Sequence, residues 1–317
     1  MKKTQFILLA VCVAALIAGC GKKSARTRLE LAFVSNNAAN FWNYAHAGCD
    51  AAAKELGNVD VDFRLPSTGN AAEQTQILND LVARGVNGIA VSVDDPDNET
   101  ALLNKIAAET LLITTDSDAP KSTRVCYIGT DNVAAGVQAG DMIKECLPDG
   151  GKIMLFVGHI DAQNAVERAN GIKKALKGSN IQILDIRTDD TDPARAQKNA
   201  EDTLVKYPDI GCLVGLWNYN GPAILNAVRN ANKIGKVKIV CFDDEDDTLS
   251  GIASGAIYGT VVQNPFEFGK EAVTLMDKYL SGDTNAFGGT TIYIPTREIK
   301  KDNVAAYQAD RAKILGK

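Results

Sequence analysis

The sequence predicts an α/β protein made of two doubly wound lobes, each built on a parallel sheet. Two observations lead to this prediction. Short β-rich runs alternate with longer segments of helical period nearly throughout the chain, and this rhythm occurs twice. The strand runs are almost continuously apolar, which is typical of parallel strands that helices cover on both faces. At 317 residues, the chain is long enough for one large or two medium domains.

Residues 29–128 carry the first round of the rhythm. Here we expect strands at 29–35, 59–65, 88–93, 112–115 and 125–128, with helices at 41–56, 71–83 and 98–109. The second round predicts helices at 131–146, 165–176, 194–206, 222–232 and 245–254, and strands at 152–157, 181–186, 211–216, 237–242 and 257–262. Pro265 is well placed to open a last long helix, which stops near Gly282.

The N-terminus has the pattern of an export signal. Two lysines at positions 2 and 3 precede an apolar run at 6–18, which is too short for a comfortable membrane span. The run ends in LIAGC at 16–20, which resembles the lipobox of bacterial lipoproteins. We therefore expect a signal peptide at 1–19, a lipid on Cys20 and a tether at 20–27, in a periplasmic protein anchored to a bacterial membrane. An uncleaved anchor helix is the alternative.

Composition and motifs exclude several classes of protein. The net charge of -5 and pI near 5.2 argue against nucleic-acid binding, which needs a basic face. The common nucleophile, dinucleotide, P-loop and zinc-protease motifs are missing, and the only histidines are His46 and His159. No C-x-x-C pair occurs, and the acidic run at 243–247 lacks the glycine of a calcium loop. We therefore expect no enzyme activity, no cofactor and no metal.

Polar and aromatic residues gather where the predicted strands end. Ligands of open parallel sheets bind beyond the carboxyl ends of the strands. A single Asp or Asn at such a place often only caps the next helix, so the prediction depends on the convergence of many. Carboxylates, amides and aromatic faces together suit a polyhydroxylated ligand. The residues are Asn37, Ser92, Asp116, Trp217, Asn218, Asp243 and Gln263, with further polar neighbours at 35–36, 94–95, 159, 161, 189–190, 244 and 264.

Residues 29 to about 299 resemble the ribose/galactose type of periplasmic solute-binding proteins, which share their two-lobed fold with LacI-type repressors. The matching motifs follow the family's order and are NFW at 40–42, DLVARGVNGI at 80–89, TD at 115–116, GTDN at 129–132, ERANG at 167–171, WN at 217–218, CFD at 241–243 and VQNP at 262–265. A repressor would carry a helix-turn-helix module before the first strand. A signal and a tether occupy that position here.

The resemblance implies roles for individual residues. Phe41 and Trp42 would stack on a sugar from the first lobe, and Asp116 would accept hydrogen bonds from its hydroxyls. Across the cleft, Arg168 would donate to ring or hydroxyl oxygens, and Trp217 would add a wall. The other candidate ligand-binding residues are Asn218 and Asp243 for further hydroxyls, Gln263 near the hinge, and Asn37 and Ser92 at strand ends.

The resemblance also implies a hinge of three segments, as in the periplasmic binding protein type I fold. Chains of this family cross between the lobes three times, here near 130–131, 263–264 and 295–296. The crossings divide the chain into an N-terminal lobe of 28–130 plus 264–294 and a C-terminal lobe of 131–263 plus 295–317. Such a hinge lets the lobes close without unfolding either core.

Three departures from the family bear on the ligand. Ser117 stands where ribose binders have an arginine, Ser92 replaces an amide, and Thr191 replaces an aromatic wall. Ribose is therefore not favoured, and a hexose, a deoxy sugar or a polyol remains open. Carboxylates at several strand ends disfavour an anion.

The predicted function is capture of a small neutral sugar or polyol and its delivery to the permease subunits of an ABC importer. We expect a monomer that binds no nucleic acid and contacts the membrane through its N-terminal lipid. Two alternatives remain open: a sensor that docks on a membrane kinase or chemoreceptor, and a binder of a non-sugar autoinducer.

Overall fold

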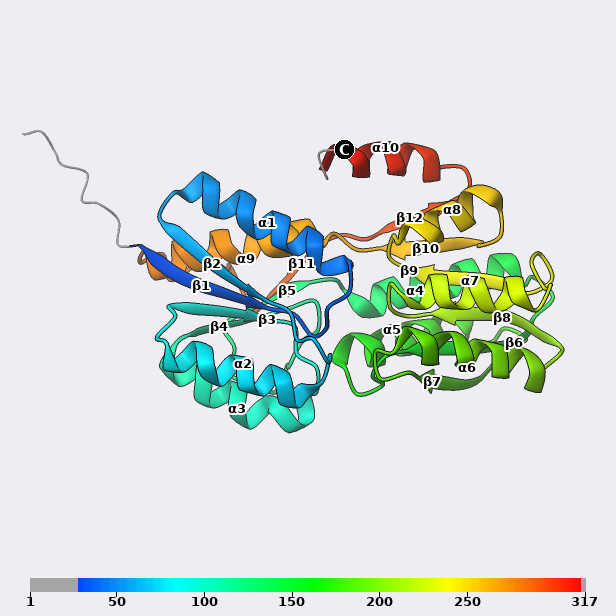
Figure 1. Cartoon of the computed structure of the whole chain (residues 1–317), viewed down its shortest axis with the longest axis horizontal. Helices are drawn as coiled ribbons and strands as arrows, with labels where there is room; N and C mark the ends of the chain where they lie inside the picture. The colour runs from blue at the N-terminus through cyan, green and yellow to red at the C-terminus, as the bar shows by residue number, and fades with distance from the viewer. Residues whose placement is uncertain (1–27, 315–317) are drawn as a thin grey trace, which may run out of the picture.

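A computed structural model describes residues 28–314, which form two α/β lobes lying side by side (Figure 1). The predicted signal peptide, the lipid on Cys20 and the tether up to residue 27 lie outside the described residues. Within 28–314, no helix is both long and apolar enough to cross a membrane. The predicted fold class of two parallel-sheet lobes is confirmed.

The first lobe contains a parallel sheet of six strands in the order β11-β5-β4-β3-β1-β2. Its strands are β1 (Leu29–Val34), β2 (Val59–Arg64), β3 (Gly88–Val91), β4 (Leu111–Thr115), β5 (Tyr127–Gly129) and β11 (Thr291–Tyr293). Its helices are α1 (Phe41–Leu56), α2 (Ala71–Ala83), α3 (Pro96–Glu109) and α9 (Pro265–Leu280).

The second lobe repeats this design with the strand order β12-β10-β9-β8-β6-β7. Only β12 runs antiparallel to its neighbour, β10. The strands are β6 (Gly151–Val157), β7 (Ile181–Thr188), β8 (Ile210–Gly215), β9 (Lys238–Phe242), β10 (Gly259–Val262) and β12 (Arg297–Lys300). The helices are α4 (Asn132–Cys146), α5 (Gln163–Leu176), α6 (Pro193–Lys206), α7 (Asn220–Asn230), α8 (Asp246–Ser254) and α10 (Val304–Ile314).

Each sheet is buried on both faces, which explains the continuous apolar runs. In β1, Leu31 and Phe33 join the core beneath α1 and α9, whereas Ala32 and Val34 join the core beneath α2 and α3. Side chains of a strand alternate between the two faces of its sheet. A strand that is covered on both faces therefore has no polar face.

The chain passes between the two sheets three times. The passages lie between Gly129 and Asn132, between Val262 and Pro265, and between the ends of β11 and β12. These three passages agree with the three-segment connection predicted for the type I fold. The lobe boundaries predicted to the residue, 28–130 plus 264–294 and 131–263 plus 295–317, stay predictions.

Candidate ligand-binding site

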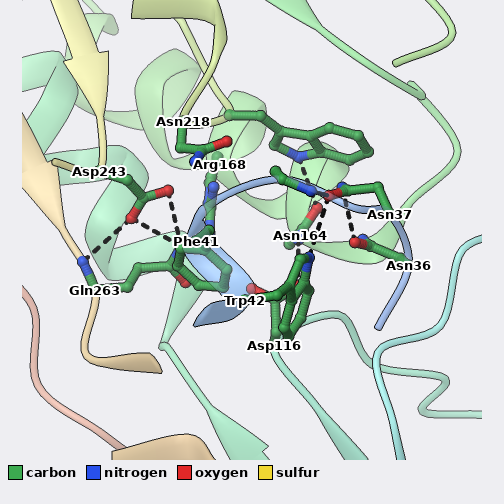
Figure 2. Close-up of a pocket in the computed structure, with 12 residues that line it drawn as sticks. Asn36, Asn37, Phe41, Trp42, Asp116, Asn164, Arg168, Asn218, Asp243 and Gln263 are labelled. Carbon is green, nitrogen blue, oxygen red and sulfur yellow. Dashed lines mark hydrogen bonds between the residues drawn. The ribbon is translucent and has the colours of Figure 1, made fainter. Parts of the chain in front are cut away.

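A cavity lies between the two lobes, at the carboxyl ends of both sheets (Figure 2). Its empty space, including the part that is open to solvent, is about 280 Å³. The loops after β1, β4, β8, β9 and β10 and the first turns of α1 and α5 supply its walls. The lining residues are Asn36, Asn37, Ala39, Phe41, Trp42, Asp116, Asn164, Arg168, Trp217, Asn218, Asp243 and Gln263.

The structure brings together every ligand-binding residue predicted from the sequence except Ser92. Ser92 lies behind the cavity wall and donates from its hydroxyl to Oδ2 of Asp116 at 2.8 Å. Asn36, one of the polar neighbours noted at the end of the first predicted strand, also lines the cavity, as do Ala39 and Asn164, which the sequence did not single out. One signal for Asn164 was present, because it precedes Arg168 by four residues and so shares a face of the same helix. The binding roles of all these residues stay predictions.

Asp116 is the charged acceptor of the first lobe. It directly follows β4, where its backbone takes a left-handed conformation with φ of 58°, and its side chain is buried. Oδ2 accepts from Ser92 and from Nδ2 of Asn164, the latter at 3.2 Å. Burial raises the pKa of this carboxyl, while the charge of Arg168 and the two hydrogen bonds oppose that rise.

Arg168 is the charged donor of the second lobe and one of the largest fully buried side chains. Its Nε donates to Oδ1 of Asn132 at 2.9 Å, and its Nη1 donates to the carbonyl of Leu216 at 2.7 Å. The guanidinium also lies 4.5 Å from the ring centroid of Phe242. Nη2 is buried and has no hydrogen-bond partner. Such a donor needs an acceptor, because a buried charged donor without a hydrogen bond costs about 1–3 kcal/mol or more.

Two glycines allow the backbone of α5 to approach α4 closely. A Cβ on Gly136 would lie 2.2 Å from the carbonyl oxygen of Arg168, and a Cβ on Gly171 would lie 2.2 Å from that of Val133. Any larger residue at these positions would push the helices apart. The pair of glycines therefore helps to fix where the Arg168 side chain enters the cavity.

Asp243 is the second carboxylate of the cavity. It follows β9 with φ of 64°, and its Oδ1 accepts from the backbone N–H and from Nε2 of Gln263, at 3.3 and 3.1 Å. Burial raises the pKa of Asp243 to about 7, opposed by the charge of Arg168 and assisted by that of Asp244. Gln263 in turn accepts at Oε1 from the hydroxyl of Thr130. Hydrogen bonds through Gln263 therefore connect the Asp243 carboxylate to two of the three hinge segments.

Aromatic side chains close the cavity on two sides. Phe41 and Trp42 meet edge to face with their ring centroids 5.0 Å apart, and the indole N–H of Trp42 donates to Asn37. From the second lobe, Trp217 donates to Oδ1 of Asn164 at 3.1 Å. A Cβ on Gly158 would lie only 2.2 Å from Cζ3 of Trp217, so this indole needs glycine beneath it.

The lobes touch each other at the rim of the cavity, so the structure is a closed form. His159 of the second lobe approaches the carbonyl of Gly69 in the first lobe at 3.0 Å, and its Nε2 lies 3.8 Å from Oδ1 of Asp94. Burial raises the pKa of Asp94 to about 6, with the His159 charge acting against it. Asn40 donates to Glu245 across the same gap at 3.4 Å.

Fixed donors and acceptors around a cavity between two lobes are typical of a solute-binding protein. Residues 31–284 match the family model described as a periplasmic binding protein domain. The chain belongs to this family, and within it to the sugar-binding type that serves ABC transporters and catalyses no reaction.

Similar proteins cover nearly the whole chain. A ribose import binding protein of Haemophilus influenzae is 30% identical over 287 residues, which is 89% of this chain and 95% of that relative. The D-allose-binding periplasmic protein of Escherichia coli is 28% identical over 80% of this chain and 85% of its own length. A solute-binding protein of Burkholderia graminis, solved with D-arabinose, is 30% identical with a TM-score of 0.83 and covers 89% of this chain and 98% of its own.

Proposed function

We propose that the protein captures a neutral monosaccharide or a polyol between its lobes and delivers it to an ABC importer. One observation carries the proposal: Arg168, whose buried Nη2 has no hydrogen-bond partner, lines a cavity together with the carboxylates of Asp116 and Asp243. A sugar oxygen satisfies the guanidinium, and sugar hydroxyls donate to the carboxylates. The aromatic rings of Phe41 and Trp42 supply apolar surface for the C–H face of a sugar.

Charge supports a neutral ligand. Two carboxylates and one guanidinium line the cavity, so an anionic ligand would meet more negative than positive charge. Like charges in a partly desolvated interface cost several kcal/mol. The sugars in the names of the related proteins, which are ribose, D-allose and D-arabinose, are all neutral.

The wall beside Asp116 bears on the choice of sugar. Ser117, which stands where ribose binders have an arginine, is buried and does not line the cavity, and its hydroxyl has no hydrogen-bond partner among the described residues. This wall therefore lacks the charged donor of the ribose binders. The amides of Asn36, Asn37 and Asn164 line the cavity near this wall and provide neutral donors and acceptors. We therefore propose a hexose, a deoxy sugar or a polyol ahead of ribose.

A ligand screen tests this assignment. Pentoses, hexoses, deoxy sugars, polyols, amino acids and sugar phosphates are compared by thermal shift and by intrinsic fluorescence. Trp42 and Trp217 are the two tryptophans of the chain, and both line the cavity, so binding should change the emission. We expect hits among neutral sugars or polyols. Hits confined to amino acids or phosphates would overturn the proposal, and a hit on ribose alone would reverse the ranking based on Ser117.

We also propose that a lipid on Cys20 anchors the protein, on the strength of the sequence at 16–20. Cys20→Ser should release the protein from membranes, because a diacylated cysteine supplies the anchor. Mass spectrometry of the native N-terminus checks the modification directly. An uncleaved or unmodified N-terminus would contradict it.

Delivery to an importer is tested in the source cells. Deleting the gene should abolish uptake of the sugar found in the screen. Unchanged uptake, together with a lost transcriptional response to that sugar, would instead support the sensor that docks on a membrane kinase or chemoreceptor.

A further inference from the structure

The C-terminal helix α10 lies outside the segment that matches the family model, which ends at residue 284. It packs against α8 and β12 of the second lobe. Figure 1 shows that its C-terminal end points toward the first lobe, on the side of α1. The helix is therefore placed to touch both lobes.

Arg311 of α10 makes that second contact. Its Nε lies 2.9 Å from Oδ2 of Asp244, and its Nη1 pairs with Asp246. The same guanidinium donates to the hydroxyl of Tyr44 in α1, with its central carbon 5.6 Å from the Tyr44 ring centroid. One side chain thus joins a loop of the second lobe to a helix of the first.

Asp244 and Tyr44, two of the partners of Arg311, lie close in sequence to residues that line the ligand cavity. Asp244 directly follows Asp243, and Tyr44 lies two residues after Trp42 in the first turns of α1. Tyr307, also in α10, donates to Oδ2 of Asp244 at 2.8 Å and holds the same loop. A movement of α10 would therefore be transmitted to residues that line opposite walls of the cavity.

The ion pair between Arg311 and Asp244 is largely shielded from solvent. The side chains of Arg311 and Asp244 are 18% and 13% exposed, whereas Asp246 is 79% exposed. Exposed ion pairs contribute little to stability, whereas hydrogen bonds between charged groups that are shielded from solvent are stronger. The Asp244 and Tyr44 contacts, rather than the Asp246 contact, should carry the effect.

We propose that Arg311 is a positioning residue for ligand binding, which clamps the loop at 243–246 to α1 when the lobes are closed. The proposal rests on the proposed function only in its effect on ligand release, because the contacts of Arg311 with Tyr44 and Asp244 join the lobes themselves. Opening the hinge separates Tyr44 from Asp244, since they belong to different lobes. The clamp therefore stabilises the closed form and slows ligand release.

Dissociation kinetics test the clamp. The probes are the sugars that bind the wild type in the screen above, and release is followed by tryptophan fluorescence in stopped flow. We expect Arg311→Ala to raise the dissociation rate roughly threefold to tenfold, and Tyr44→Phe to raise it less. Arg311→Lys should raise the dissociation rate less than Arg311→Ala does, because lysine keeps the positive charge but lacks the planar guanidinium. Lys313→Ala is the matched control on the same helix, since Lys313 is exposed and, among residues 28–314, forms its ion pair with Asp310. Equal rates in all variants would overturn the clamp.

Hydrogen exchange of the ligand-free, full-length protein makes the result independent of any sugar. We expect Arg311→Ala to speed exchange of the amides at 41–47 and 244–249, and Lys313→Ala to leave both segments unchanged. Unaltered exchange at 41–47 in Arg311→Ala would mean that no clamp reaches the first lobe. A wild type that binds none of the sugars would contradict the proposed function, while the exchange data would still decide the clamp.

Discussion

Asn164 of the second lobe donates a hydrogen bond to Asp116 of the first lobe, with 3.2 Å between Nδ2 and Oδ2. Ser92 donates to the same carboxylate oxygen. Within the described part of the chain, no residue donates to Oδ1 of Asp116, so this oxygen is left to a ligand. Because Oδ1 of Asn164 also accepts from Trp217, one amide orients the carboxylate of one lobe and the indole of the other.

Replacing Asn164 should therefore weaken binding although its neighbours remain. In Asn164→Ala, Asp116 loses a donor and the indole N–H of Trp217 loses its acceptor. We expect the affinity to fall roughly tenfold, since an unmade buried hydrogen bond costs about 1–3 kcal/mol. Asn164→Asp should bind more weakly still, because it places a second carboxylate beside Asp116. Titration by tryptophan fluorescence measures both, with exposed Asn79→Ala as the control. Unchanged affinity in Asn164→Ala would remove the amide from the site.

Loss of the charge on Asp116 should weaken binding further. Asp116→Asn keeps the shape of the side chain but removes the charged acceptor that a ligand hydroxyl would use. Hydrogen bonds to charged groups contribute about 1.5–3 kcal/mol, so the affinity should drop roughly tenfold to a hundredfold. Calorimetric titration checks this value. Asp149→Asn, an exposed change between α4 and β6, should leave the affinity unchanged. A folded Asp116→Asn variant that binds as tightly as wild type would contradict the assignment.

Much of the fold and site follows from the sequence, because strands buried on both faces are uniformly apolar and the polar residues begin where those strands end. The elements that the sequence missed lack this signal. β11 is only three residues long and mostly exposed, and α10 has no strong apolar stripe in its sequence. Asn164 was missed because it lies in the first turn of a helix, where an amide is ordinary. Its partners, Asp116 and Trp217, come from distant segments that only the folded chain brings together.

The position of Trp217 depends on Gly158. A Cβ at residue 158 would lie 2.2 Å from the indole, which real structures do not allow. Gly158→Ala should displace Trp217 and reduce the affinity roughly tenfold, because overpacking a buried contact costs typically 1–3 kcal/mol. Gly289→Ala is a matched control, since a Cβ there meets nothing within 4 Å. A shift in the emission of the ligand-free protein reports the moved indole. If Gly158→Ala had the same emission and affinity as wild type and Gly289→Ala, this role of Gly158 would be contradicted.

Asp243 should link stability to pH. Burial raises the pKa of its carboxyl from 3.8 to about 7. Between these two values, the folded protein holds a proton that the unfolded chain has released. The free energy of unfolding of the ligand-free protein should therefore fall as the pH rises from about 4 to 7, at up to about 1.4 kcal/mol per pH unit for one group. Urea unfolding across this range measures the slope. Asp243→Asn should flatten it only in part, because burial also raises the pKa of Asp94 and Asp189, each to about 6.

The same carboxyl should make ligand binding depend on pH with the opposite sign. A ligand hydroxyl that donates to Asp243 favours the charged form and so lowers its pKa. Binding should then release a proton, and the affinity should rise as the pH increases from about 5 to 7. Calorimetry in two buffers with different heats of ionisation counts the released protons. Asp243→Asn should weaken binding and release fewer protons than wild type. Proton uptake on binding, or an affinity that falls over this range, would mean that the ligand does not contact the charged carboxylate.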